Sequence, residues 1–326
     1  MHMAPRRLVI GAEDLGSLGE FGLIDALSAW LPPGPRTLVG IGDDAAVLAT
    51  PDGRVVATTD FLLEGRHFRL DWSSAADVGH KAAARSLADV AAMGARPTGL
   101  LVALAAPPDL PVNWLMSLTS GLAAECARAG ASVIGGDTAR ADAVLLAVTG
   151  LGDLAGRAPV RRAGAAPGDV VAVAGPLGHA AAGLAILSKA AGSPDDPALA
   201  PLVAAQLRPE PDYDAGPRAA ALGATAMIDV SDGLLADLAH IAVASEVQIN
   251  LRTAALTDPD LITAGGSTSA LTWTLTGGED HSLAATFPPG VRLPAPWRVI
   301  GEVGEGHGVL VDGHPYEGPK GWDHFR

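Results

Sequence analysis

Short apolar segments that end in an acidic residue beside glycine, serine or threonine recur along this sequence, and they are the strongest constraint on its fold. Residues 39–48 read VGIGDDAAVL, in which two glycines lead to the adjacent acids Asp43 and Asp44 before apolar chain resumes. Adjacent carboxylates repel each other unless a cation or water neutralises them. A solvated turn explains one such segment equally well, because Asp and Gly are both favoured in turns. The repetition is therefore the informative feature.

The same pattern returns at four further places, each where a strand is expected to end: Thr58-Thr59-Asp60, Gly135-Gly136-Asp137-Thr138, Asp229-Val230-Ser231-Asp232 and Gly277-Gly278-Glu279-Asp280. At the third place, Ser231 or Asp232 is expected to cap the following helix, so that backbone amides can face an anion. Asp89 differs, because it lies inside an expected helix among apolar neighbours. A buried, unpaired acid is costly there, and either a metal or a solvated helix face would remove that cost.

Composition excludes several classes of protein. The 326 residues allow about two domains. No apolar run approaches the roughly 18 residues that span a bilayer, and the apolar run at residues 8–10 is too short for a secretory signal. A net charge of −14 argues against nucleic acid, because phosphate backbones require patches of Lys and Arg. The single cysteine, Cys126, lies in a helical pattern, so we expect a buried structural thiol in a cytoplasmic protein.

The sequence contains no Walker-A loop for phosphate binding. Its three lysines, Lys81, Lys189 and Lys320, each follow a residue other than glycine. An acidic chain repels a phosphorylated ligand unless divalent cations bridge the two. Oxygen ligands without clusters of His and Cys favour Mg²⁺ over zinc or iron. The residues alone therefore predict a phosphate-handling enzyme that binds several metal ions, although a turn acid or a helix cap remains the alternative at any single site.

The pattern of apolar residues predicts a mixed α/β chain of two halves. We expect helices at residues 75–93, 112–129, 178–191 and 233–245, and strands at residues 54–59, 99–106, 132–136, 143–151, 169–174, 225–230 and 271–276. The helix at 233–245 carries one apolar stripe, formed by Leu234, Leu235, Leu238, Ile241 and Ala242. Residues 152–168, which contain two prolines and three arginines, are the best boundary and give domains 1–150 and 151–326. The regular βαβ alternation of a Rossmann fold is missing, so the fold class is α+β.

Taken together and in order, the motifs of this sequence resemble those of the thiamine-phosphate kinases. The match includes EFGLI at residues 20–24, GIGDD at 40–44, TTD at 58–60 with GRHF at 65–68, LADVAAMGA at 87–95, GGDT at 135–138, IDVSDGL at 228–234, GGED at 277–280 and GWDHF at 321–325. The resemblance implies ATP-dependent phosphorylation of thiamine monophosphate to thiamine diphosphate. It also implies the fold of aminoimidazole ribonucleotide synthetase, in which an N-terminal ATP- and Mg²⁺-binding domain dimerises through its strands.

The same resemblance implies roles for individual residues. Several Mg²⁺ ions would be bound by Asp43, Thr58, Thr59, Asp60, Asp89, Asp137, Asp229 and Asp232. ATP would contact Gly136, Asp137, Arg162 and Ser231, and the substrate would contact His67, Glu279 and Trp322. No catalytic residue is implied apart from the metal ligands, among which Asp60 is the most critical. Family members commonly have Tyr after Gly-Gly-Glu-Asp, whereas His281 follows here, and this affects the expected packing or substrate fit at that point.

Other enzymes of the same superfamily match less well. A selenophosphate synthetase would have a reactive cysteine near its N-terminus, and a hydrogenase-maturation relative would have one at its C-terminus, whereas only Cys126 occurs here. An aminoimidazole ribonucleotide synthetase agrees with the fold but not with the motif around Trp322. The alternative from another class is a catalytically inactive dimer that senses a nucleotide, although a sensor would not need the full set of acids.

Overall fold

The computed structural model describes residues 30–41, 46–190 and 196–322. Its strands are β1 (Thr37–Val39), β2 (Val47–Leu48), β3 (Val56–Leu63), β4 (Arg96–Ala106), β5 (Val133–Arg140), β6 (Leu145–Asp153), β7 (Val170–Ala174), β8 (Ala226–Val230), β9 (Gln248–Leu251), β10 (Ser282–Phe287), β11 (Trp297–Gly304), β12 (Gly308–Val311) and β13 (His314–Pro315). Its α-helices are α2 (Ala75–Ala92), α3 (Val112–Ala129), α4 (His179–Ala190), α5 (Ala200–Leu207), α6 (Ala215–Ala221), α7 (Leu234–Ser245) and α8 (Pro259–Thr276). The expected mixture of helices and strands is confirmed.

The chain divides into two compact units. The first comprises residues 1–87 and 97–153, and the second comprises residues 88–96 and 154–326. Helix α2 contributes residues to both units, because the division falls within its last turns. None of the helices in the described part of the chain is long and apolar enough to cross a membrane.

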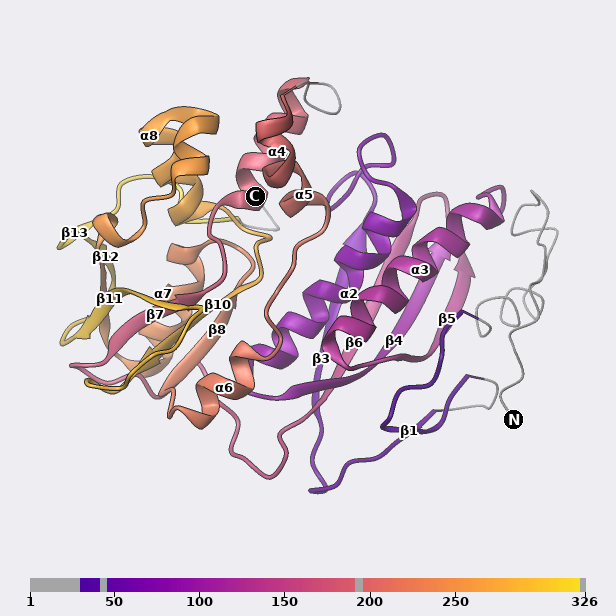
Figure 1. The fold of residues 1–326 in the computed structure, drawn as a ribbon, viewed down its shortest axis with the longest axis horizontal. Coiled ribbons are helices and arrows are strands. Elements are labelled where there is room, and N and C mark those ends of the chain that lie inside the picture. Colours follow the sequence, from indigo (N-terminus) through magenta and orange to yellow (C-terminus); the bar gives the residue numbers. More distant parts are fainter. Residues whose placement is uncertain (1–29, 42–45, 191–195, 323–326) are drawn as a thin grey trace. The chain divides into compact units, whose positions relative to one another are not determined.

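The first unit contains a four-stranded sheet in the order β3-β6-β4-β5, with α2 and α3 across one of its faces (Figure 1). Strands β3 and β6 are antiparallel, whereas β4 and β5 are parallel and are connected through α3. Two glycines bring the helices into close contact. A Cβ atom on Gly79 would lie 2.0 Å from the Leu118 carbonyl oxygen, and one on Gly121 would lie 2.1 Å from that of Ala76. Larger residues would therefore force α2 and α3 apart.

Helices α2 and α3 of this unit are each capped at one end. At the start of α2, the Ser74 amide donates to Asp77 Oδ2 (3.0 Å) and the Asp77 amide donates to Ser74 Oγ (3.2 Å), which is a capping-box arrangement. Helix α3 ends at Gly130, which has the left-handed φ of 71° that favours glycine. Cys126 on α3 is 1% exposed, and burial raises the pKa of its thiol to about 12. The expected buried structural thiol is confirmed.

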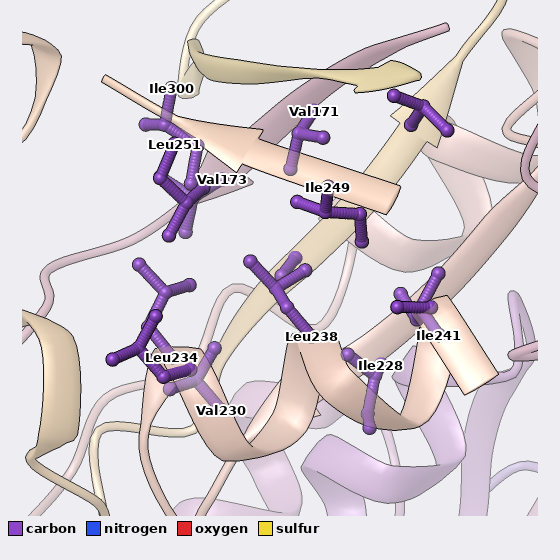
Figure 2. Close-up of a cluster of buried hydrophobic side chains, with 14 of the residues drawn as sticks. Val171, Val173, Ile228, Val230, Leu234, Leu238, Ile241, Ile249, Leu251 and Ile300 are labelled. Carbon is purple, nitrogen blue, oxygen red and sulfur yellow. The ribbon is translucent and has the colours of Figure 1, made fainter. Parts of the chain in front are cut away.

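The second unit contains a seven-stranded mixed sheet in the order β13-β12-β9-β11-β7-β10-β8. Helix α7 packs its apolar stripe against this sheet, and Figure 2 shows Leu234, Leu238 and Ile241 facing the strands. All five predicted stripe residues are at most 1% exposed. At roughly 1.5–3 kcal/mol for each buried apolar side chain, this stripe supplies much of the energy that holds α7 to the sheet.

One predicted strand is wrong, because residues 271–276 form the end of helix α8. The threonines of this segment suggest a strand, since β-branched residues are favoured there. In the structure their hydroxyls instead donate to carbonyls four residues earlier, as Thr274 does to Ala270 (2.9 Å) and Thr276 to Thr272 (2.8 Å). The hydroxyls of these threonines are thus hydrogen-bonded within the helix. Asp258 caps the helix and Pro259 occupies its first turn. Gly266, within the helix, has non-helical dihedral angles.

Candidate functional site

The sequence pattern placed Asp60 at the end of a strand. In the structure it lies within strand β3, which continues to Leu63. The Ser86 hydroxyl on α2 donates to Asp60 Oδ2 at 2.8 Å and also lies 3.1 Å from the Val148 carbonyl oxygen. Arg85 Nη2 lies 4.0 Å from Asp60 Oδ1. Both α2 residues are buried, whereas the Asp60 side chain is 24% exposed. A carboxylate that is oriented from one side and open on the other is suited to binding a cation.

The neighbouring threonines do not all point the same way as Asp60. Successive side chains of a strand point to opposite faces, so Thr58 and Asp60 share one face and Thr59 lies on the other. The Thr59 hydroxyl is 3.2 Å from both the Val148 carbonyl oxygen and the Thr149 hydroxyl. One ion therefore cannot take the Thr59 hydroxyl and the Asp60 carboxylate together without a change in this strand.

Asp137 lies on the opposite edge of the same sheet. It is an exposed residue of β5, and its Oδ1 accepts a hydrogen bond from the Thr138 amide (2.8 Å). Strands β6 and β4 separate β5 from β3. Three strand spacings of about 4.8 Å amount to about 14 Å of sheet, so Asp60 and Asp137 of one chain do not bind the same ion. Gly136, beside Asp137, is required by packing, because its Cβ would overlap the Val102 carbonyl.

In the second unit, four candidate residues come together where β8 passes into α7. The Glu279 amide donates to the Ser231 carbonyl (2.8 Å), and the Trp322 amide donates to the Asp232 carbonyl (2.9 Å). Glycines allow both approaches, since a Cβ on Gly278 would lie 2.2 Å from the Ser231 carbonyl oxygen and one on Gly321 would lie 2.6 Å from that of Asp232. Trp322 is 59% exposed, so its backbone is bound while its indole is open to solvent.

The predicted cap of α7 is wrong. The N-cap residue is Gly233, and no side chain of Ser231 or Asp232 caps the helix. Instead Asp237, from the first turn of α7, accepts hydrogen bonds on Oδ2 from the amides of Ser231 (3.1 Å), Asp232 (3.1 Å) and Gly233 (3.0 Å). A buried carboxyl group thus occupies the amides that were expected to face an anion. The only feature of the sequence that pointed to this contact was an acidic residue in the first turn of the expected helix.

Two buried acids of this region have raised pKa values. Burial raises the pKa of Asp237 to about 7, and the charges of Asp229 and Asp232 act in the same direction. Burial also raises the pKa of Asp280 to about 6, against the effect of amide hydrogen bonds from Gly178 (2.5 Å) and Ala180 (2.8 Å) at the start of α4. Asp280, which the sequence placed in an acid pair, is thus a structural residue that fixes α4.

His281, the departure from the family pattern, is paired with Asp229. Its Nδ1 lies 3.1 Å from Asp229 Oδ2, and the two side chains are 2% and 6% exposed. Both Glu279 and His281 have left-handed φ values, 69° and 52°, on either side of Asp280. The imidazole therefore lies against Asp229 and orients its carboxylate.

The remaining predicted residues lie elsewhere. Asp43 lies outside the described residues, and Asp89 is half-buried in the last turns of α2. His67 lies in the turn after β3. Arg162 is exposed and its carbonyl accepts from Ser245 at the C-terminal end of α7 (3.0 Å). Because α7 has 12 residues, about 18 Å separates that end, where the Arg162 backbone lies, from Ser231.

The donor set is compatible with Mg²⁺ that is shared with a phosphorylated ligand. No group of three or more His, Cys, Asp or Glu side chains that could hold a metal alone occurs within residues 30–41, 46–190 and 196–322. Mg²⁺ is usually bound by one or two carboxylates together with substrate phosphates. Asp60 in the first unit, and Asp229 with Asp232 in the second, match this requirement.

Comparison with known proteins identifies the family. Residues 42–154 match the family model for AIR synthase related protein, N-terminal domain. The thiamine-monophosphate kinase of Mycobacterium tuberculosis is 48% identical over 316 residues, which are 95% of this chain and 93% of the relative. The crystal structure of thiamine-monophosphate kinase from Stenotrophomonas maltophilia K279a has a TM-score of 0.82 at 35% identity, covering 91% of this chain and 98% of that one. The structure of AaThiL complexed with AMPPCP and TMP has a TM-score of 0.79 at 34% identity, covering 97% of this chain and all of that one. The chain therefore belongs to the thiamine-monophosphate kinase family, and the predicted fold of aminoimidazole ribonucleotide synthetase is confirmed.

Proposed function

We propose that this protein transfers the γ-phosphoryl group of ATP to thiamine monophosphate and so forms thiamine diphosphate. The observation that carries this proposal is 48% identity to a thiamine-monophosphate kinase over nearly the whole of both chains. A structural neighbour complexed with AMPPCP and TMP, an ATP analogue and the substrate, supports both ligands. The single buried thiol is consistent with a cytoplasmic enzyme.

The acceptor makes a dedicated general base unnecessary. A phosphate monoester has a second pKa of about 6, so the attacking oxygen is largely ionised at neutral pH. Catalysis then requires in-line positioning of the two phosphates and cancellation of their negative charge. Bound Mg²⁺ would supply that cancellation. The chain's own part is to hold the ions and both substrates in place.

We assign this part to the residues that the family motifs indicate. The metal ligands are Asp43, Thr58, Thr59, Asp60, Asp89, Asp137, Asp229 and Asp232, and the ATP contacts are Gly136, Asp137, Arg162 and Ser231. His67, Glu279 and Trp322 contact thiamine monophosphate. The exposed indole of Trp322 suits stacking on the thiazolium or pyrimidine ring, and the carboxylate of Glu279 suits a cationic substrate. Domain 1–150 would bind ATP and Mg²⁺ through the metal ligands and ATP contacts that it contains, and domain 151–326 would add Arg162, Asp229, Ser231 and Asp232.

A homodimer is part of the same proposal. The face of the four-stranded sheet opposite α2 and α3 exposes Phe61 (56%) and Leu101 (37%), and β3 and β5 are edge strands within the described residues. Apolar side chains on an open sheet are suited to a second sheet. Within one chain, Asp60 and Asp137 lie too far apart to bind the same ion. A second copy could place its own Asp137 near Asp60.

A coupled assay of ADP release tests the proposed function. Turnover should require thiamine monophosphate, whereas free thiamine and aminoimidazole ribonucleotide precursors should give only background. Turnover with the aminoimidazole precursor would indicate a synthetase of the same superfamily. Nucleotide binding without turnover on any acceptor would indicate a sensor.

A further inference from the structure

Lys81 is the largest of the fully buried side chains, with 2% of its surface exposed. A polar group buried in this way is costly unless it is hydrogen-bonded. Its Nζ donates to the carbonyl oxygen of His67 at 3.2 Å, so part of the compensation comes from the turn that follows β3. Nothing in the proposed reaction uses Lys81 directly. Its contact with the turn therefore needs a separate explanation.

The turn at residues 64–68 is built by its own backbone. The amides of Gly65 and His67 donate to the carbonyls of Phe68 (2.8 Å) and Leu63 (2.9 Å). Gly65 has a φ of 77°, which favours glycine. The Glu64 carboxylate accepts from the Val144 amide at 2.9 Å, which ties the turn to the residue just before β6. The hydrogen bond from Lys81 also ties the turn to helix α2, through the His67 carbonyl oxygen.

The same turn fixes the hydrogen-bonding character of the His67 ring. The Leu63 amide donates to His67 Nδ1 at 3.1 Å, so Nδ1 carries a lone pair. The ring hydrogen of the neutral imidazole must then lie on Nε2. In this arrangement Nε2 can bind only acceptor atoms.

We propose that Lys81 is a positioning residue, which holds the turn so that His67 Nε2–H meets an acceptor atom of thiamine monophosphate. This inference rests on the proposed function, and it adds both the tautomer of His67 and the buried residue that maintains it. Loss of the Nζ–carbonyl bond frees the peptide unit of His67. The ring can then rotate away from Leu63, and binding of this one substrate weakens.

Steady-state kinetics of Lys81→Met, His67→Ala and the double variant test the proposal. Lys81→Met should raise the KM for thiamine monophosphate roughly ten- to a hundredfold and leave the KM for ATP within about twofold, because only one substrate is misplaced. Lys81→Arg, which keeps a donor, should recover part of the loss. The double variant should be no worse than His67→Ala, since both changes remove the same contact. Lys189→Met, at an exposed residue of α4, is the matched control and should behave as wild type.

Equal increases in both KM values, or additive effects in the double variant, would overturn the proposal and leave Lys81 a purely structural residue. The ¹⁵N shifts of His67 in the wild-type protein give a measurement that is independent of turnover and of any variant's folding. They should report the Nε2–H tautomer, and an Nδ1–H tautomer would refute the arrangement. Absence of thiamine-monophosphate-dependent turnover in the wild type, with the expected tautomer present, would instead overturn the proposed function.

Discussion

In the four-stranded sheet the candidate ligands lie along strands, whereas at the junction of β8 and α7 they lie on loops that backbone hydrogen bonds draw together. Asp60 and Asp137 occupy opposite edges of the sheet, and Thr59 points to the other face from Asp60. At the junction, by contrast, Glu279 and Trp322 are bound through their own amides to Ser231 and Asp232. The residues of the junction are joined by backbone hydrogen bonds within one chain, whereas Asp60 and Asp137 of the sheet lie too far apart to share an ion.

The largest effect is expected at the sheet. Asp60→Ala should lower kcat by at least about a hundredfold, because it removes a proposed ligand of the Mg²⁺ that would cancel the charge of the phosphates. The thermal midpoint should fall only modestly, because Asp60 is partly exposed and Ser86 keeps its contact with the Val148 carbonyl, although the buried Arg85 loses a neighbouring carboxylate. Asp71→Ala is the matched control, because Asp71 is an exposed acid of the same unit that pairs with Arg69. A near-normal rate for Asp60→Ala would show that the sheet carboxylate is dispensable.

At the junction, the largest expected effect is on stability. Asp237→Ala removes the acceptor for three amides and should lower the free energy of unfolding by about 3 kcal/mol. Asp237→Asn should keep most of that stability, because all three bonds go to one oxygen that the amide oxygen of Asn can replace. Chemical denaturation measures both variants. Equal losses would mean that the charge of Asp237 matters more than its hydrogen bonds.

The His281–Asp229 pair should contribute less. His281→Ala should cost about 2 kcal/mol, because the buried Asp229 carboxylate loses its hydrogen-bond partner. His281→Asn keeps a donor and tolerates the left-handed backbone, so its loss should be smaller. In a double-mutant cycle, Asp229→Asn in the His281→Ala background should cost less than it does alone. Strictly additive costs would show that the two residues are not coupled.

A further prediction is a pH dependence at the same junction, whose effect is spread over several pH units. Because the pKa of Asp237 is raised in the folded state to about 7, folding favours its protonated form. Its contribution is therefore complete below the unfolded pKa of about 4 and is lost as the pH rises towards 7. Unfolding in EDTA should show wild type losing stability relative to Asp237→Asn between pH 4 and 7. Parallel pH profiles of the two proteins would contradict this assignment.

The sequence predicts best what depends on local pattern. The stripe of α7 and the end of α3 at Gly130 follow from apolar periodicity and from the one residue type suited to a left-handed cap. The prediction of a strand at residues 271–276 was wrong, because these residues form a helix in which the threonine hydroxyls bond to carbonyls four residues earlier. The roles of Ser86 and Lys81 could not be predicted, because the pattern of a helix does not show which distant strand or turn each of its residues will contact. The geometry of the site depends on contacts between residues far apart in the sequence, which the local pattern does not predict.

The most direct test is a calorimetric titration of the wild-type protein with the ATP analogue AMPPCP, with Mg²⁺ and again with EDTA. The chain has a net charge of −14, no Walker-A loop, and an α7 N-terminus whose amides are occupied by Asp237. If its carboxylates hold the phosphates through divalent cations, binding should be readily measurable with Mg²⁺ and absent in EDTA. Equal affinity under both conditions would contradict the account, because the protein would then bind phosphates without the metal that its acids are proposed to hold.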